Sequence, residues 1–217
     1  MNVDKVVDAL KLTVWDTRLG QVVRRWREDA QAGKWIRSGR PIPPPHIVKQ
    51  QVLRHHRERF GLSTLIETGT YQGDMIHAMR DAFSRIYSIE LDERLYRRAL
   101  KRFKGMPHVT ILQGDSGVVL KRVLSEETEP CLLWLDGHYS GSGTARGDLD
   151  TPIEAELRAV LRDRNKRHVI LVDDARLFNG IDGYPTVKEI EALVAAERPD
   201  CIVEVADDVI RICPSRS

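Results

Sequence analysis

The pattern of hydrophobic and polar positions changes character near residue 60. Before that point, apolar residues recur at helical spacing, as they do between Leu19 and Trp26. This spacing predicts two amphipathic helices before Gly33. The proline run at residues 41–45 ends the pattern, because proline lacks a backbone donor and restricts the residue before it. A third helix is predicted at residues 46–59.

After residue 60, short apolar runs alternate with amphipathic stretches. The runs predicted to be strands are residues 64–68, 85–91, 109–114, 131–137, 168–174, 201–206 and 209–214. The stretches between the first six runs have helical periodicity, and Asp92 is a predicted N-cap. Nearly continuous apolar strands that alternate with helices indicate a parallel sheet covered on both faces. The last two strands, joined by Asp207 and Asp208, indicate an antiparallel hairpin.

The predicted fold is therefore α/β. It has a doubly wound seven-stranded sheet that is mostly parallel, an antiparallel C-terminal hairpin and an N-terminal helical extension. We expect two domains, with the helical extension and its proline-rich linker at residues 1–45 and the sheet domain at residues 46–217.

Composition is that of a globular protein outside a membrane. The chain has 217 residues, of which 41% are hydrophobic and 30% charged. No apolar run approaches the roughly 20 residues that cross a bilayer, and the first residues lack the apolar stretch of a signal peptide. The cysteines Cys131, Cys201 and Cys213 lie in strand-like runs, which favours buried reduced thiols. We expect a cytoplasmic protein.

Charge is unevenly spread along the chain. Residues 1–60 hold 13 Lys and Arg against 6 Asp and Glu, a balance of +7, and the remaining residues hold 21 against 26, a balance of −5. A basic front part can attract phosphate or nucleic acid. It can also be a solvated helix face, and the sequence leaves both readings open.

Each of the first five predicted strands ends in a carboxylate or a glycine loop. In open α/β sheets, ligands bind beyond the carboxyl ends of the strands. The residues at these ends are the loop of residues 67–73, then Glu90, Asp115, Asp136, and the pair Asp173 and Asp174. We expect them to line one edge of the sheet.

The glycine loop indicates the kind of ligand. Gly69 and Gly73 follow a G-x-x-x-G spacing, which differs from the G-x-G-x-x-G of dinucleotide binders. Glu90 lies 21 residues beyond Gly69, at the distance where an acid meets ribose hydroxyls in Rossmann-type sites. Together these features favour an adenosyl ligand.

At these motifs the chain resembles a known family. LIETGTYQGDM at residues 65–75 resembles the first motif of class I S-adenosylmethionine-dependent methyltransferases, whose fold is Rossmann-like. LWLDGHY at 133–139 and ILVDDA at 170–175 resemble the metal-dependent branch that includes macrocin-type sugar O-methyltransferases. The resemblance covers roughly residues 60–214 and leaves the N-terminal helices unexplained.

The resemblance implies a role for each strand end. Residues expected around the methionine end of the cofactor are Glu67, Gly69 and Gly73, and further expected cofactor-binding residues are Thr70, Tyr71 and Asp136. Glu90 would bind the ribose hydroxyls, and Asp115 with Ser116 would contact the adenine. Residues expected to hold a divalent cation, with Mg²⁺ as the expected ion, are Asp136, Asp173 and Asp174.

Methyl transfer to a hydroxyl also needs activation of a poor nucleophile. A cation held by carboxylates favours the alkoxide or phenolate, with Asp136 at the catalytic centre. His138, two residues on, is a candidate general base or metal ligand, and its alternative is a solvated loop histidine. For Asp174 the alternative to metal binding is a helix or loop cap. The polar loop at residues 139–150 is predicted to be a substrate lid, or else a flexible surface loop.

The leading hypothesis is an enzyme that uses S-adenosylmethionine and a divalent cation to O-methylate a small hydroxylated acceptor, such as a sugar or a natural-product glycoside. An RNA methyltransferase is the second hypothesis, but residues 54–60 offer too few aromatics to stack bases, so nucleic acid is not the expected partner. The third is a non-catalytic cofactor-binding scaffold. The apolar stripes of the N-terminal helices suggest a homodimer interface, or docking on the protein's own core.

Overall fold

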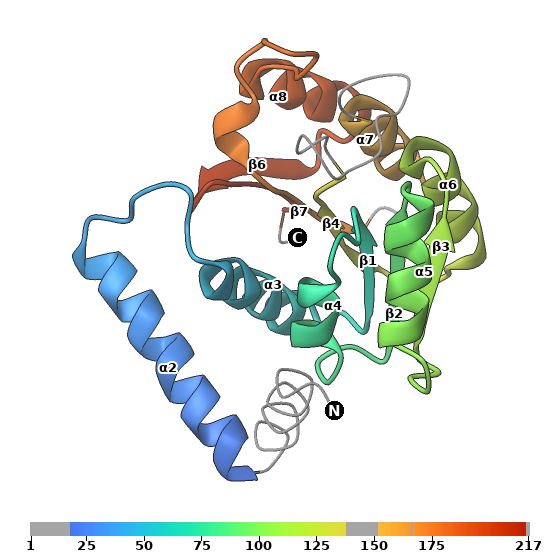
Figure 1. Cartoon of the computed structure of the whole chain (residues 1–217). Helices are drawn as coiled ribbons and strands as arrows, with labels where there is room; N and C mark the ends of the chain where they lie inside the picture. The colour runs from blue at the N-terminus through green and yellow to red at the C-terminus, as the bar shows by residue number, and fades with distance from the viewer. Residues whose placement is uncertain (1–17, 138–151, 166, 216–217) are drawn as a thin grey trace. The chain divides into compact units, whose positions relative to one another are not determined.

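The computed structural model describes residues 18–137, 152–165 and 167–215 (Figure 1). The chain divides into two compact units, Met1–Lys49 and Gln50–Ser217. The division falls within helix α3 (His46–Phe60), four residues beyond the boundary expected from the proline run. The expected first helix lies outside the described residues.

The second unit contains a seven-stranded sheet in the order β3-β2-β1-β4-β5-β7-β6. Its strands are β1 (Thr64–Thr68), β2 (Arg85–Glu90), β3 (Val109–Gln113), β4 (Cys131–Leu135), β5 (Val169–Val172), β6 (Cys201–Ala206) and β7 (Val209–Pro214). The first five strands pair in parallel, whereas β7 is antiparallel to both β5 and β6. This confirms the predicted mostly parallel sheet with its C-terminal hairpin.

Helices cover both faces of this sheet. They are α4 (Asp74–Met79), α5 (Glu93–Arg102), α6 (Ser116–Glu126), α7 (Ile153–Leu161) and α8 (Val187–Glu197), with a short 3₁₀ helix η1 (Ala175–Leu177) after β5. One face packs against α6, α7 and α8, and the other against α4, α5 and the part of α3 that belongs to this unit. The sheet is therefore doubly wound, as predicted.

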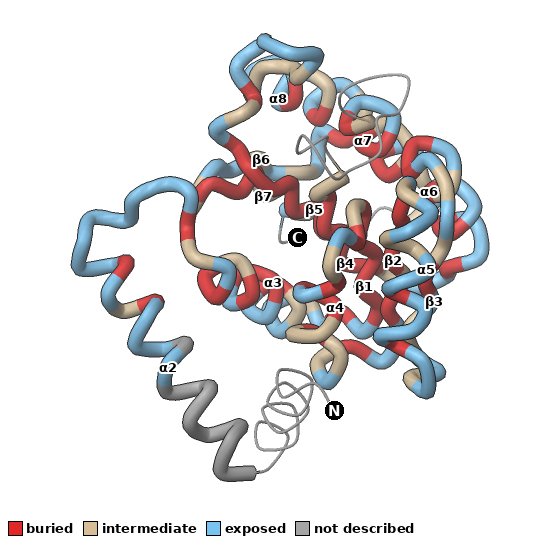
Figure 2. The backbone as a smooth tube through the Cα atoms, viewed as in Figure 1, coloured by how far each residue is buried: buried red, intermediate tan, exposed pale blue. Residues whose placement is uncertain are grey.

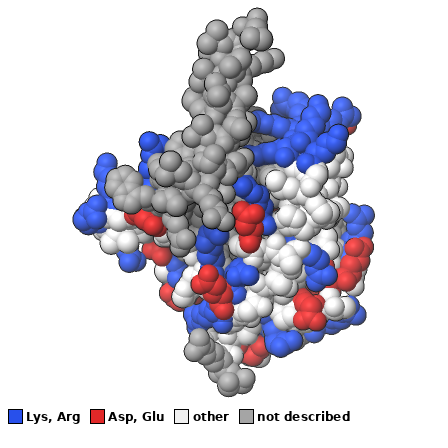
Figure 3. All heavy atoms as spheres, turned by 90° about the horizontal axis from the view of Figure 1, so that it is seen from below, with Lys and Arg blue, Asp and Glu red and all other residues white. Residues whose placement is uncertain are grey.

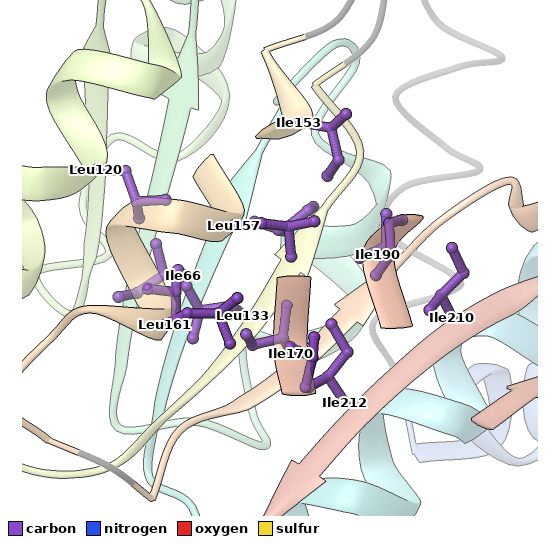
Figure 4. Packing of buried hydrophobic residues seen from close by; sticks show 14 of the residues in the cluster. Ile66, Leu120, Leu133, Ile153, Leu157, Leu161, Ile170, Ile190, Ile210 and Ile212 are labelled. Atoms are coloured by element: carbon purple, nitrogen blue, oxygen red, sulfur yellow. The ribbon is translucent and has the colours of Figure 1, made fainter. Parts of the chain in front are cut away.

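The core consists of one apolar layer on each side of the sheet. Strands β1 and β4 are buried along their whole length, because each lies in the middle of the sheet and beneath helices on both faces (Figure 2). On one face, Leu157 and Leu161 of α7 pack with Leu133 of β4 and Ile170 of β5 (Figure 4). The continuous burial explains why these strands read as unbroken apolar runs.

The first unit contains α2 (Arg18–Arg37) and the start of α3. Ala32 and Trp35 of α2 form a small cluster with Ile47 and Val48 of α3. The Trp35 indole N–H donates to the carbonyl of Pro41 at 2.7 Å, which closes the chain over the proline run. The second predicted helix was expected to end before Gly33, but α2 continues for four residues beyond that glycine, because its packing outweighs the weak helix propensity of one glycine.

None of the described helices is long and apolar enough to cross a membrane.

Candidate cofactor and acceptor site

The carboxyl ends of five parallel strands meet at one edge of the sheet. Four backbone hydrogen bonds continue the ladder just beyond the strands, and each joins a different neighbouring pair. They are Gly69 N–H to Ile89 O at 2.9 Å, Gly114 N–H to Glu90 O at 3.0 Å, Asp136 N–H to Thr68 O at 3.1 Å and Asp173 N–H to Leu135 O at 3.0 Å. The acidic strand ends predicted from the sequence are therefore brought to one edge.

The loop after β1 is pressed against the end of β4. Gly69 has φ +82°, and a β-carbon placed there would lie 2.4 Å from the carbonyl oxygen of Asp136. Only glycine fits, because the conformation is left-handed and the neighbouring atom is backbone. The close approach leaves the edge above β1 and β4 free of side chains from position 69.

The far end of the same loop rests on helix α5. Gly73 precedes α4 with φ +78°, and a β-carbon there would lie 2.7 Å from the ring of Phe103. Arg102 of α5 donates to the carbonyl of Gln72 and to the carboxylate of Asp74, the latter at 2.7 Å. The loop is thereby fixed at both glycines.

Glu90, at the end of β2, is held in one orientation by backbone donors. Its Oε2 accepts the N–H of Tyr71 at 2.8 Å, and its Oε1 accepts the N–H of Asp92 at 2.9 Å. Burial and the nearby Asp92 charge raise its pKa, while the backbone N–H donors lower it. Each carboxylate oxygen has a second lone pair, so the side chain can still accept hydrogen bonds from a ligand.

Glu67 is a buried acid in the middle of the site. Its Oε2 accepts the hydroxyl of Ser88 at 2.5 Å, and Ser88 in turn shares a 2.6 Å hydrogen bond with Thr70. Burial, together with the neighbouring charges of Glu90 and Asp74, raises the pKa of Glu67 to about 8. Glu67 is therefore mainly protonated at neutral pH, and the network ties β1, β2 and the glycine loop together.

The end of β3 presents Asp115 beside Glu90. Gly114, whose N–H donates to Glu90 O, leads to Asp115, the N-cap of α6. One oxygen of Asp115 accepts the N–H of Gly117 at 2.8 Å, and the residue is exposed, whereas Ser116 is buried. Asp115 thus has a carboxylate oxygen that faces solvent at the edge where a ligand would lie.

Asp173 and Asp174 follow β5 but take different directions. Asp173 is buried, and its Oδ1 accepts the N–H of Asp174 at 2.8 Å. Asp174 has φ +55°, and its Oδ1 lies 2.8 Å from a guanidinium nitrogen of Arg176, which also pairs with Asp208 in the β6–β7 turn. Asp174 therefore lies in an ion-pair network with the hairpin.

The predicted metal-binding trio is only partly assembled. Asp136 and Asp173 lie at neighbouring strand ends, joined through the β4–β5 ladder, while Asp174 is engaged by Arg176. Among residues 18–137, 152–165 and 167–215, no three His, Cys, Asp or Glu side chains converge closely enough to hold a metal ion. His138 and the predicted lid at 139–150 lie outside the described residues.

Sequence reasoning missed one acidic residue at this edge. Glu156, in the first half of α7, is only 1% exposed and lines a small pocket with Gly137 and Asp173. The helical spacing of the sequence could have identified Glu156, because this residue lies on the same face of α7 as the core residues Ile153 and Val160. An acid on the apolar face of an amphipathic helix is a candidate functional residue.

The fold of this chain is similar to that of several solved structures. No family model and no curated protein matches the sequence. The O-methyltransferase TomG from Streptomyces achromogenes, involved in tomaymycin synthesis and solved with S-adenosylmethionine, is 16% identical, with a TM-score of 0.57 over 88% of this chain and 89% of its own. An O-methyltransferase from Bacillus cereus in complex with S-adenosylhomocysteine is 16% identical, with a TM-score of 0.58 over 96% and 97%.

A third solved structure is similar to this chain to the same degree. The S-adenosylhomocysteine-bound methyltransferase PaMTH1 from Podospora anserina is 16% identical, with a TM-score of 0.56 over 93% of this chain and 97% of its own. At such low identity the likeness concerns the course of the chain. The comparisons show that this chain has the Rossmann-like methyltransferase fold.

Proposed function

We propose that the protein is an S-adenosylmethionine-dependent methyltransferase that O-methylates a small hydroxylated acceptor, such as a sugar or a natural-product glycoside, with help from a divalent cation. The observation that carries the proposal is the fixed carboxylate of Glu90, held by the backbone of the glycine loop at 2.8 Å and placed beside the end of β3. An acid in this position suits a pair of ribose hydroxyls.

The described residues divide into binding roles along the edge. Glu90 would accept hydrogen bonds from the ribose, and Asp115 with Ser116 would contact the adenine. The loop from Gly69 to Gly73 would surround the methionine end, with Glu67 beneath it. The cofactor supplies a methyl group activated on a sulfonium, and what the chain adds is position and exclusion of water.

The part of the site proposed to bind the methyl acceptor lies near the ends of β4 and β5. Asp136 and Asp173 offer oxygen ligands of the kind that Mg²⁺ prefers, and such an ion commonly keeps water or substrate oxygens in its other positions. Bound there, a cation would lower the pKa of an acceptor hydroxyl. His138 as general base, Asp174 as a further ligand and residues 139–150 as a lid remain part of the proposal.

A small acceptor fits the surface better than a nucleic acid does. On the face shown in Figure 3, the described Lys and Arg side chains are interspersed with Asp and Glu, apart from one basic group at the upper right of the view. A phosphate backbone favours a continuous basic stripe. Acidic residues also dominate the candidate edge, which would repel a polyanion.

Transfer of labelled methyl groups tests the proposal. The full-length protein is incubated with methyl-labelled S-adenosylmethionine and a panel of sugars, glycosides and catechols, with and without a chelator. We expect transfer to at least one hydroxyl-bearing acceptor and a loss of at least ten-fold with chelator that added Mg²⁺ reverses. Transfer that is insensitive to the chelator would remove the cation from the proposal, and transfer only to RNA would replace the acceptor class.

A further inference from the structure

Ser88, on β2, connects two residues assigned to the cofactor site. It is fully buried, and the pairing of β2 with β1 places it directly beside Glu67. Its hydroxyl donates to Oε2 of Glu67 at 2.5 Å and lies 2.6 Å from Oγ1 of Thr70 in the glycine loop. The three side chains make no other hydrogen bond with the described part of the chain. Ser88 therefore joins a buried acid to the loop expected around the cofactor.

The direction of this hydrogen-bond chain follows from its hydrogens. A serine hydroxyl has a single hydrogen, and that of Ser88 is directed at Glu67, so the hydrogen between Ser88 and Thr70 belongs to Thr70. When Glu67 is ionised, the two hydroxyl hydrogens fill both contacts, and each bond strengthens the next. A proton on Glu67 is an additional hydrogen, for which the described residues provide no acceptor. The chain therefore matches an ionised Glu67 better than a protonated one.

The charges that face Glu67 nevertheless favour its protonated form. They are the acids Glu90 at the end of β2 and Asp74 of α4, and Asp74 is itself paired with Arg102 of α5 at 2.7 Å. From β4, the residue in register with Glu67 is the uncharged Trp134. Burial, helped by the two acids, raises the pKa of Glu67 to about 8, although its hydroxyl donor lowers it. A cation that approaches such a carboxyl favours its ionisation.

The outer end of the chain is suited to a cationic donor. Because the hydroxyl hydrogen of Thr70 points inward to Ser88, both lone pairs of its Oγ1 remain available to a donor. Thr70 lies between Gly69 and Gly73, in the loop proposed to surround the methionine end of the cofactor. That end carries an ammonium and a sulfonium group, so it would bring positive charge to a site whose own charges are mainly acidic.

We propose that Ser88 is a positioning residue that links Glu67 to Thr70, and that binding of the cationic cofactor releases the Glu67 proton to the solvent. The inference rests on the proposed function and adds a proton to its binding step. The O–H bond of the Glu67 carboxyl breaks, its electron pair stays on the carboxylate, and the buffer takes the proton. Because the bound state then holds fewer protons than the free state, cofactor affinity increases with pH until Glu67 is ionised in the free protein too, near pH 8.

Calorimetric titration of the full-length protein with S-adenosylmethionine, without any acceptor, tests the inference. Binding at pH 7 is measured in buffers of different ionisation enthalpy, and the dependence of the heat on that enthalpy gives the number of protons released. We expect the wild type to release at least about 0.5 proton per cofactor, because a group with a pKa of about 8 is mainly protonated at pH 7. Between pH 6 and pH 7.5 the affinity should increase about ten-fold.

Two variants and one control separate the residues of the chain. Glu67→Gln should release less than about 0.2 proton and show less than a three-fold change in affinity over this pH range, because the group that titrates is gone. Ser88→Ala should bind the cofactor at least five-fold more weakly at pH 7, because an ionised Glu67 loses its one donor among the described residues. Thr64→Val is the matched control, since Thr64 is a buried hydroxyl at the other end of β1, in contact with Arg85. It should release protons like the wild type.

Binding to the wild type without proton release and with an affinity independent of pH overturns the inference, while leaving the methyltransferase assignment intact. This measurement needs no variant, so the inference stays testable if a substitution prevents folding. Wild-type affinity and proton release in Ser88→Ala would exclude the link through Ser88, and release that persists in Glu67→Gln would assign the proton to another group. Absence of S-adenosylmethionine binding would instead contradict the proposed function itself.

Discussion

At the scale of single residues, the acids at this edge of the sheet have different electrostatic tasks. Glu90 has backbone donors on both oxygens, so its charge is oriented for a ligand. Glu67 has one serine donor and is fully enclosed, so its proton is retained. Sequence spacing could identify both residues as site residues. It could not separate their tasks, because the difference depends on donors that come from other segments of the chain.

Glu67 gives the protein a pH-dependent stability. Its pKa is raised to about 8 from an ordinary value of 4.5, so the folded state binds the proton more tightly than the unfolded state does. The stabilising contribution is complete below pH 4.5 and is lost as the pH rises through 8. Between pH 5.5 and 8.5 we expect Glu67 to account for a loss of about 3 kcal/mol in the free energy of unfolding.

Glu67→Gln removes this titration but keeps an acceptor for the Ser88 hydroxyl. Urea unfolding at several pH values, without cofactor, measures the effect. The variant is expected to lose less stability than the wild type over this range. Parallel pH profiles for the two proteins would show that Glu67 does not titrate with a raised pKa.

At the scale of elements, the hydrophobic pattern predicts the strands closely because they are buried. The observed bounds of β1, β6 and β7 are those predicted, while β4 and β5 end two residues earlier, where Asp136 and Asp173 begin the polar loops. The predicted N-cap at Asp92 is confirmed, since its side chain accepts the N–H groups of Arg94 and Leu95.

The structure departs from the sequence-based prediction where tertiary contacts decide. Helix α2 continues through Gly33 because Trp35, beyond that glycine, packs on α3. Glu156 is not among the site residues predicted from the sequence. Its helical phase alone places it on the buried face, but the pocket that it shares with Asp173 depends on how α7 sits over the sheet.

The contact between the β1 loop and the end of β4 is the element-level feature most sensitive to substitution. Gly69→Ala would introduce a β-carbon 2.4 Å from the carbonyl oxygen of Asp136 in a left-handed conformation. Gly105→Ala is the matched control, because φ is +90° there and no atom lies within 4 Å of the added carbon. Thermal unfolding and S-adenosylhomocysteine affinity are measured for both variants.

We expect Gly105→Ala to cost about 1 kcal/mol of stability through backbone strain alone and to leave cofactor affinity unchanged. Gly69→Ala should cost a further 1–3 kcal/mol or so, because the collision with backbone adds to the strain, and should weaken cofactor binding. Equal effects of the two substitutions would mean that the loop does not press on β4.

At the scale of the whole molecule, the candidate site belongs to the second unit alone. Every described residue assigned to the cofactor or cation lies between positions 67 and 174, within the compact unit Gln50–Ser217. The N-terminal helices are therefore proposed to serve association, in line with the homodimer suggested by their apolar stripes.

Deletion of residues 1–40 tests this division. We expect the shortened protein to bind S-adenosylhomocysteine within three-fold of the wild-type affinity, and its mass in solution to fall from dimer to monomer. An unchanged mass would exclude an interface made by these helices. A loss of cofactor binding would show that the first unit contributes to the site.

Calorimetric titration of the full-length protein with S-adenosylhomocysteine tests the central claim most directly. We predict micromolar or tighter binding to the wild type. Glu90→Ala should weaken it at least ten-fold, because hydrogen bonds to a charged acceptor contribute about 1.5–3 kcal/mol each. Glu93 is an exposed acid three residues beyond Glu90 and is paired with Arg97, so Glu93→Gln should bind like the wild type. No binding to the wild type, or equal binding to Glu90→Ala, would contradict the account.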